Sequence, residues 1–143
     1  MNFGQEPRKH FYQTSAYPLW LDCIDSTKSK SVSTTGYLQY LRKIGALNQT
    51  VGVPTSMYAS GQQWDYPNAF APFQLILVEA LEGSGVTELQ NEAFRLAEKW
   101  VHTNYRAFHE TGAMFEKVRG PLRSYKHLRL FMLGGMRFMQ IDE

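Results

Sequence analysis

The chain has 143 residues, enough for one modest domain, and its hydrophobic (43%) and charged (20%) fractions are ordinary for a globular protein. Its net charge of +2 comes from the end of the chain: residues 1–117 carry 10 basic and 11 acidic side chains, and residues 118–143 carry 5 and 2. A nucleic-acid-binding domain would carry a basic patch on its main body, so nucleic acid is not an expected partner.

The composition excludes further classes of protein. Cys23 is the only cysteine, so no internal disulfide can form. Cysteine and histidine are too few for a structural zinc site, and no apolar run approaches the length that spans a membrane. Met1 is not followed by the charged and apolar regions of a signal peptide. We therefore expect neither a metal nor a membrane segment in this chain.

The first half of the chain shows little helical periodicity. We expect residues 1–34 to be mostly irregular, with a surface loop rich in Ser, Thr and Lys over residues 26–35. A short amphipathic helix is predicted over residues 37–47. Residues 52–72 are punctuated by Gly and Pro and are predicted to form a loop.

Two longer helices are predicted to follow. Pro72 suits the first turn of a helix that ends at the Gly-Ser-Gly of residues 83–85. Its buried stripe consists of Phe73, Ile76, Leu77, Ala80 and Leu81. Thr87 and Gln90 form the pattern of a capping box, and the second helix runs from there to about His109. Its apolar face comprises Leu89, Ala93, Leu96, Ala97, Trp100, Val101 and Phe108. No convincing strand alternation is present, which favours an all-α fold.

The decapeptide QWDYPNAFAP at residues 63–72 is the most unusual segment. Its two prolines restrict the backbone and exclude regular helix before them. Three aromatic rings offer flat apolar faces beside three side chains that form hydrogen bonds. The rings are those of Trp64, Tyr66 and Phe70, and the side chains that form hydrogen bonds are those of Gln63, Asp65 and Asn68. Aromatic plates edged with amides and a carboxylate suit a sugar, although a well-packed turn would use the same residues.

This decapeptide closely resembles a signature of the trehalases, the glycoside hydrolases that split α,α-trehalose into two glucoses. The family usually has Trp where this chain has Phe70, a change that keeps an aromatic ring and loses the indole N–H donor. Three other segments resemble the family in order and approximate spacing. They are Phe11-Tyr12 with Pro18-Leu19-Trp20, the GVPTS sequence at residues 52–56, and Met114-Phe115-Glu116-Lys117.

The resemblance implies an (α/α)6 toroid, in which paired helices form the ring and loops at one end build the sugar site. Twelve helices cannot come from 143 residues, so we expect an all-α piece of such a toroid, incomplete at both ends. The resemblance covers about residues 2–117, so we assign residues 1–117 to a fragment of the family's catalytic domain. Residues 118–143 lack the family's Gly-rich, Glu-Tyr and Phe-Gly-Trp segments. We interpret them as a basic tail from an alternative exon, a retained intron or a shifted frame, or else as a divergent helix.

Glycosidases usually use two carboxyl groups, one on each side of the scissile bond. The resemblance implies an inverting mechanism and matches Glu116 to the family's general base. The alternative is a solvated Glu116 paired with Lys117 or Arg119. Asp65 is the other tempting carboxylate, but the family's general acid is an Asp in a segment that precedes everything present here. We therefore assign Asp65 to positioning the loop or contacting sugar hydroxyls, with a purely structural role, such as capping the helix at Phe73, as the alternative.

Other loop residues are candidate substrate contacts. Trp64 would stack on or edge a glucose ring, with a plain core position as its alternative. Gln63 and Asn68 would bond sugar hydroxyls, or satisfy backbone groups of the loop. His102 and His109 lie seven residues apart, whereas a metal-binding pair typically lies four apart, so we expect surface or interface histidines.

The resemblance thus implies an enzyme that hydrolyses the disaccharide trehalose without a cofactor. Because the presumed acid lies outside this sequence, we expect the isolated chain to have little or no activity. The alternatives are a non-catalytic relative that binds sugar or a partner, and an unrelated all-α interaction module. The first interpretation requires Glu116 and residues 63–70 to line one common concavity. Complete family members are secreted, membrane-anchored, periplasmic or cytosolic, so the compartment stays open.

Overall fold

The computed structural model describes residues 10–24 and 29–119 of the chain. Over these residues it is mostly helical, so the all-α fold class is confirmed, while the toroid stays a prediction. The described elements, in chain order, are the 3-10 turn η1 (Gln13–Ala16), α1 (Tyr17–Trp20), α2 (Lys30–Lys43), the 3-10 turn η2 (Ala46–Asn48), β1 (Asn68–Phe70), α3 (Ala71–Glu82), α4 (Thr87–Thr111) and β2 (Lys117–Arg119).

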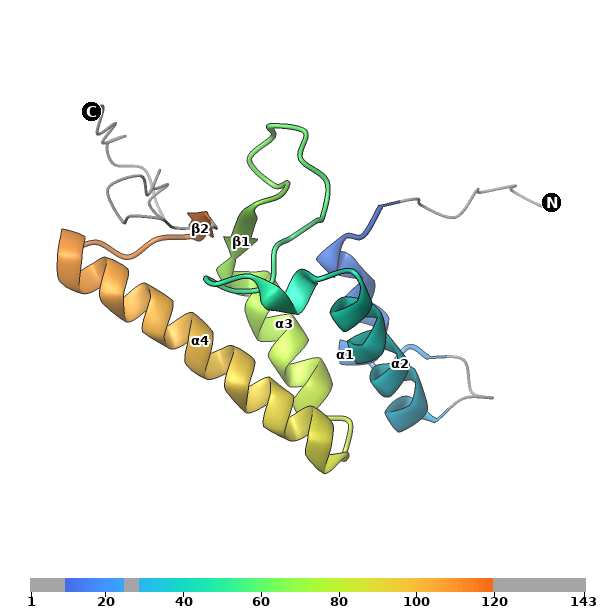
Figure 1. Cartoon of the computed structure of the whole chain (residues 1–143). Helices are drawn as coiled ribbons and strands as arrows, with labels where there is room; N and C mark the ends of the chain where they lie inside the picture. The colour runs from blue at the N-terminus through green and yellow to red at the C-terminus, as the bar shows by residue number, and fades with distance from the viewer. Residues whose placement is uncertain (1–9, 25–28, 120–143) are drawn as a thin grey trace.

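A hairpin of α3 and α4 forms the centre of the molecule, and α3 lies between α4 and α1 (Figure 1). Pro72 lies in the first turn of α3, as predicted, where its missing N–H has no helical partner to lose. α4 ends at Gly112, whose φ of 70° suits a residue without a side chain. The Gly112 N–H donates to the Phe108 carbonyl at 2.7 Å. Both helices therefore begin and end within about two residues of the predicted positions.

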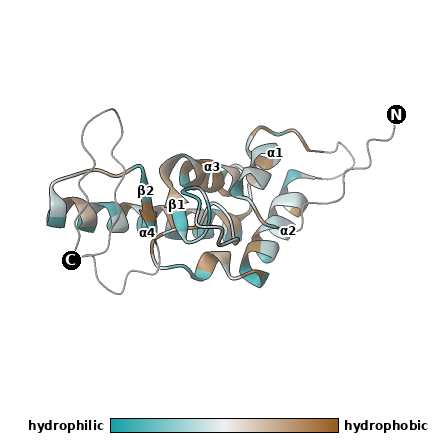
Figure 2. Cartoon of the chain, turned by 90° about the horizontal axis from the view of Figure 1, so that it is seen from above, coloured by the Kyte–Doolittle hydropathy of each residue, from teal (hydrophilic) through white to brown (hydrophobic). Residues whose placement is uncertain are grey.

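The core lies where α2, α3 and α4 meet. α3 is the most apolar of the three and is coloured largely brown in Figure 2; it packs against α4 and α1. Leucines from all three helices are at most 3% exposed: Leu38, Leu41, Leu77, Leu81, Leu89 and Leu96. Burying such side chains contributes about 1.5–3 kcal/mol each, which makes this contact the main source of stability.

The prediction for the first half of the chain is partly wrong. η1 and α1 interrupt the expected irregular region, and α2 occupies residues 30–43 rather than 37–47. Ser29 caps α2 by accepting a hydrogen bond from the Val32 N–H at 3.3 Å. The hydroxyls of Thr34 and Thr35 donate to backbone carbonyls one turn earlier, each at 2.8 Å, so these polar residues are accommodated within the helix.

Two expectations about α4 are also corrected. Its N-cap is Val86, an aliphatic residue that cannot accept a hydrogen bond, so the capping box is wrong; Gln90 instead donates to the Glu82 carbonyl at 3.3 Å. Val101 and Phe108 were expected on the buried face but are 64% and 48% exposed. The buried positions in this half of the helix are Thr103 and Ala107.

Two three-residue strands, within the part of the chain that the structure describes, were not predicted. β1 and β2 pair antiparallel, with Ala69 opposite Val118 and Phe70 opposite Lys117. Ala69 and Val118 are fully buried in a second, smaller apolar cluster, which also contains Val51, Ala107 and Phe115. This ladder joins the end of the decapeptide to the segment that follows α4.

Candidate functional site

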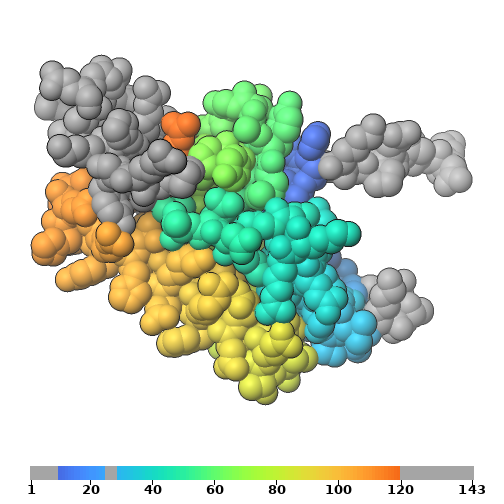
Figure 3. Space-filling model, viewed as in Figure 1, coloured from blue at the N-terminus to red at the C-terminus, as the bar shows by residue number. Residues whose placement is uncertain are grey.

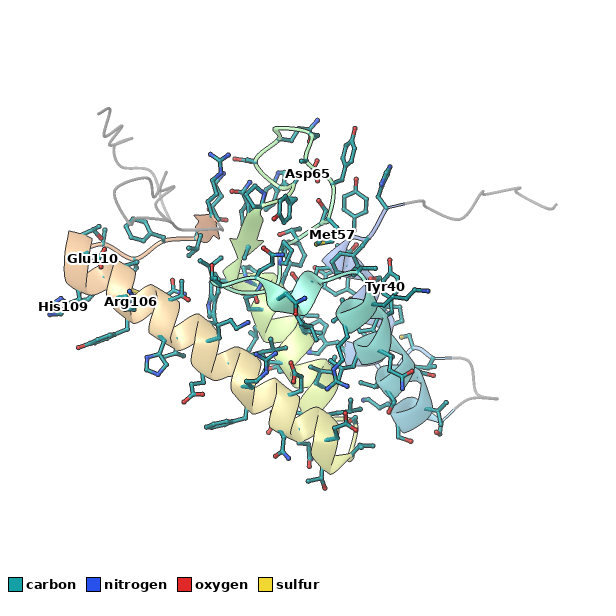
Figure 4. The ribbon with its side chains drawn as sticks, in the orientation of Figure 1. Tyr40, Met57, Asp65, Arg106, His109 and Glu110 are labelled. Carbon is teal, nitrogen blue, oxygen red and sulfur yellow. The ribbon has the colours of Figure 1, made fainter. Side chains whose placement is uncertain are left out.

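Asp65 lies within the loop that projects above β1 (Figure 4). Its carboxylate accepts hydrogen bonds from the Ser56 hydroxyl at 2.8 Å and from the Ser60 hydroxyl. Only 6% of the residue is exposed. Asp65 therefore holds the loop closed upon itself. The helix-capping alternative is wrong, because the N-cap of α3 is Phe70, a side chain without an acceptor.

Asn68 joins this loop to the adjoining segments. Its side-chain Nδ2 donates to the Asp65 carbonyl at 2.8 Å, and its own carbonyl accepts from the Thr55 N–H at 2.9 Å. The side chain is therefore used to satisfy loop backbone, which was one of its two predicted roles. Between these residues, the peptide bond from Tyr66 to Pro67 is cis.

The aromatic face of the loop is accessible. Trp64 stacks on Phe70 with ring centroids 4.4 Å apart and planes inclined by 24°. Trp64 is nevertheless 46% exposed, so the alternative that placed it in the core is wrong. Gln63, immediately before it, is also exposed. The Trp64 indole is supported by the Phe70 ring and is otherwise open to solvent, so it can stack against an apolar face of a ligand.

Glu116 lies directly beside the end of this loop. It immediately precedes β2, and its carbonyl accepts a hydrogen bond from the Ala71 N–H at 3.2 Å. Its side chain is half-buried. The ladder thus brings Glu116, in the segment that follows α4, next to the end of the aromatic loop, and Figure 3 shows the loop and β2 adjacent at the surface.

Lys117, the residue after Glu116, is buried in the same place. It is 5% exposed, and its Nζ lies 5.7 Å from the centroid of the Phe70 ring. Burial lowers the pKa of the Lys117 ammonium below its ordinary value; the Glu116 carboxylate opposes that decrease, and Arg119 adds to it. Sequence reasoning named Lys117 as part of the motif around Glu116 and as a possible partner for that carboxylate.

Gln74 and Gly52 hold the segment around Val53 in place; sequence reasoning missed Gln74 and named Gly52 only as part of the GVPTS motif. The Gln74 amide accepts from the Val53 N–H at 2.9 Å and donates to the Val53 carbonyl at 2.7 Å. A side chain at Gly52 would meet the Trp100 ring at 2.9 Å. A signal for Gln74 was present in the sequence, since it is an amide within an otherwise apolar helix.

Two further sequence predictions concern groups away from this site. His102 and His109 are exposed on α4, as expected, and His109 lies near the C-terminal end of that helix, away from Asp65 (Figure 4). The described residues contain no group of three or more His, Cys, Asp or Glu side chains placed to hold a metal. No helix among them combines the length and apolar character needed to cross a membrane.

The expected basic tail lies mainly outside the described residues. Val118 and Arg119 belong to β2, and residues 120–143 are not described. The division of the chain at residue 117 therefore stays a prediction.

Comparison with known proteins identifies relatives over most of the chain. Residues 3–119 match the family model named Trehalase. The chain is 41% identical over 110 residues to the trehalase of Apis mellifera, a match that covers 77% of this chain and 17% of that protein. It is 38% identical over 114 residues to the trehalase of Oryctolagus cuniculus, covering 80% and 19% of the two chains. The corresponding match to the trehalase of Homo sapiens is 34% identical over 113 residues, covering 79% and 19%.

The chain therefore spans less than a fifth of the length of these curated relatives. The match nevertheless includes every segment that builds the site, from the loop held by Asp65 to the strand that follows Glu116. Because the family model covers residues 3–119 of 143, the chain belongs to the trehalase family.

Proposed function

We propose that this chain contributes the general base and one wall of the sugar site to an α,α-trehalase, which hydrolyses trehalose to two glucose molecules. The observation that carries the proposal is the β1–β2 ladder in a chain of this family. Next to this ladder, the Ala71 N–H donates to the Glu116 carbonyl, so Glu116 lies at the end of the loop that exposes Trp64.

Glu116 is the proposed general base. Its carboxylate takes a proton from a water whose oxygen attacks the anomeric carbon. The glycosidic C–O bond breaks as a second carboxylic acid protonates the leaving oxygen. Such carboxyl pairs stand roughly 6.5–9.5 Å apart in inverting enzymes, which leaves room for the water. A half-buried position immediately before β2 suits this role, since the backbone is held by the bond from the Ala71 N–H while the side chain still reaches solvent.

The loop residues divide between sugar contact and support. Trp64 offers its exposed ring to the C–H face of glucose, and Gln63 offers its exposed amide to a hydroxyl. Asp65 and Asn68 support these two residues, because their polar groups are engaged by Ser56, Ser60 and loop backbone.

The second carboxyl group is not assigned to any residue of this chain. The family resemblance places the general acid in a segment before these residues, and the chain spans 17–19% of its relatives. The isolated 143-residue polypeptide is therefore expected to release little or no glucose from trehalose. A catalytically inactive polypeptide that binds sugar through the loop is the alternative function, and the exposed Trp64 is the observation that favours it.

A segment exchange tests the catalytic proposal. Residues 3–119 replace the matching segment of the trehalase of Apis mellifera, and the anomers of released glucose are followed by proton NMR before mutarotation. Inversion at one glucose predicts equal initial amounts of α- and β-glucose, whereas retention predicts α-glucose alone. Glu116→Gln is expected to lower kcat by about 10²–10⁴-fold, the usual contribution of a general base.

Glu110→Gln is the matched control, because Glu110 is an exposed glutamate near the C-terminal end of α4 (Figure 4). It is expected to leave kcat unchanged. An active exchanged enzyme whose Glu116→Gln variant keeps its full kcat would refute the assignment of the base. Initial release of α-glucose alone would refute inversion.

A further inference from the structure

Lys117 is an unusual residue for its position. Lysine is among the side chains least often buried, because its ammonium loses hydration, yet Lys117 is 5% exposed. Filling space beside β1 would be served equally well by an unbranched apolar side chain such as methionine. The conflict between charge and burial therefore requires an explanation in the contacts of the ammonium.

The ammonium lies near an aromatic ring that belongs to the sugar loop. Lys117 Nζ is 5.7 Å from the Phe70 centroid, within the range of a cation–π interaction. Phe70 in turn stacks on Trp64 at 4.4 Å. Phe70 and Lys117 are also directly opposite in the ladder, so backbone pairing and side-chain contact act between the same two residues.

Lys117 is at the same time joined to the candidate base. It follows Glu116 in the chain, and the Glu116 carboxylate interacts electrostatically with its ammonium. On the other side of the ladder, Ala71 follows Phe70 and donates its N–H to Glu116. The lysine therefore contacts the aromatic loop through Phe70 and the catalytic segment through its own backbone.

We propose that Lys117 is a positioning residue: its ammonium over the Phe70 ring fixes the Trp64–Phe70 stack against β2, so that the sugar-stacking surface and the Glu116 carboxylate keep one spacing. The assignment rests on the proposed function for its catalytic meaning. The structural part of the proposal is that the contact between Lys117 and Phe70 holds β1 and β2 together, and this coupling can be measured without an activity assay.

Hydrogen exchange of the full 143-residue chain, followed residue by residue by NMR, tests the coupling. The Ala71 amide reports the contact between the loop end and Glu116, and the Leu81 amide in the buried part of α3 reports global opening. Lys117→Met should raise exchange at Ala71 at least five-fold and leave Leu81 within two-fold. Lys117→Arg, which keeps a cation for the ring, should restore exchange at Ala71 to within two-fold of wild type.

The control variant is Lys43→Met, at the exposed end of α2, which should leave both amides unchanged. A double-mutant cycle keeps the test decisive even if Lys117→Met destabilises the whole chain. In a Phe70→Leu background, Lys117→Met should add less than two-fold at Ala71, because the ring that the cation contacts is gone. Additive effects of the two substitutions, or equal effects of Lys117→Met and Lys117→Arg, would overturn the proposal.

Addition of trehalose separates the positioning role from the proposed function. Saturating trehalose should slow exchange at Ala71 in the wild-type chain and in Lys117→Arg, and should do so less in Lys117→Met. If trehalose changes nothing in the wild type while the cycle stays non-additive, the coupling of Lys117 to Phe70 is supported, and the segment exchange decides the proposed function separately. If trehalose protects wild type and Lys117→Met equally, the sugar site stands and the positioning role is overturned.

Discussion

Replacing Gln74 by leucine should destabilise the fold through two orphaned backbone groups. The Gln74 amide accepts from the Val53 N–H at 2.9 Å and donates to the Val53 carbonyl at 2.7 Å. Val53 is 1% exposed and Gln74 is 4% exposed, so water cannot replace either bond without opening the structure. Leucine has a similar size but no polar atom, which leaves both groups of Val53 unpaired.

The expected loss follows from these two groups. Each buried backbone group left without a partner costs about 1–3 kcal/mol, so the pair costs about 2–6 kcal/mol. Burial of the apolar leucine side chain offsets about 1–2 kcal/mol of that. We expect a net loss of about 3 kcal/mol in the free energy of unfolding. With a urea slope of about 2 kcal/mol per molar, the unfolding midpoint should fall by about 1.5 M.

Urea unfolding followed by tryptophan fluorescence measures this change. The matched control is Gln39→Leu, because Gln39 is an exposed helical glutamine on α2. It should alter the free energy of unfolding by no more than about 0.5 kcal/mol. If Gln74→Leu costs less than about 1 kcal/mol, or no more than Gln39→Leu, the role assigned to the Gln74 amide is refuted.

Two further predictions concern packing and pH. Gly52→Ala places a Cβ 2.9 Å from the Trp100 ring at a φ of 153°, so it should lower the free energy of unfolding in urea by about 2–3 kcal/mol. The control is Gly36→Ala in helix α2, where a Cβ would meet no atom within 4 Å and should not destabilise the chain. Equal losses at both sites would contradict the close contact at Gly52. Burial raises the pKa of Tyr37 to about 12 from 10.0, so its stabilising contribution is complete below pH 10 and is lost as pH rises towards 12. The difference in unfolding free energy between wild type and Tyr37→Phe should therefore change by about 1.4 kcal/mol between pH 8 and pH 11, and a difference that is constant with pH would contradict the raised pKa.

The helices were predictable where their signals are local. α3 and α4 carry apolar residues at helical spacing, and Pro72 and Gly112 mark a start and an end through their own backbone preferences. α2 was misplaced because its first two turns contain Ser and Thr, which favour loops in isolation. In the folded chain, Thr34 is fully buried and its hydroxyl bonds within the helix, so tertiary burial overrides the local preference.

The strands could not be predicted, because three residues are too few to show alternation and β1 is buried at every position. Their pairing joins Ala69 to Val118, which are far apart in the sequence. The prediction of a capping box at the start of α4 was also wrong, because the local pattern does not decide which residue caps the helix. Thr87 and Gln90 match the pattern, but the chain enters α4 with Val86 as the cap.

The sequence by itself determined the residue types of the site and the family to which they belong. The loop from Gln63 to Phe70, and Glu116 within its short motif, are recognisable because a motif is a string of neighbouring residues. The sequence also determined the α3–α4 hairpin, since helical hydrogen bonds join residues only four positions apart.

Only the tertiary structure decided how these residues are used. It placed Glu116 against the start of α3, engaged Asp65 with two serines, left Trp64 open and buried Lys117 beside Phe70. Each of these outcomes depends on contacts between segments distant in the chain. Their free energy comes from burial and pairing that exist only after α3, α4 and the β1–β2 ladder have assembled, and no local spacing encodes them.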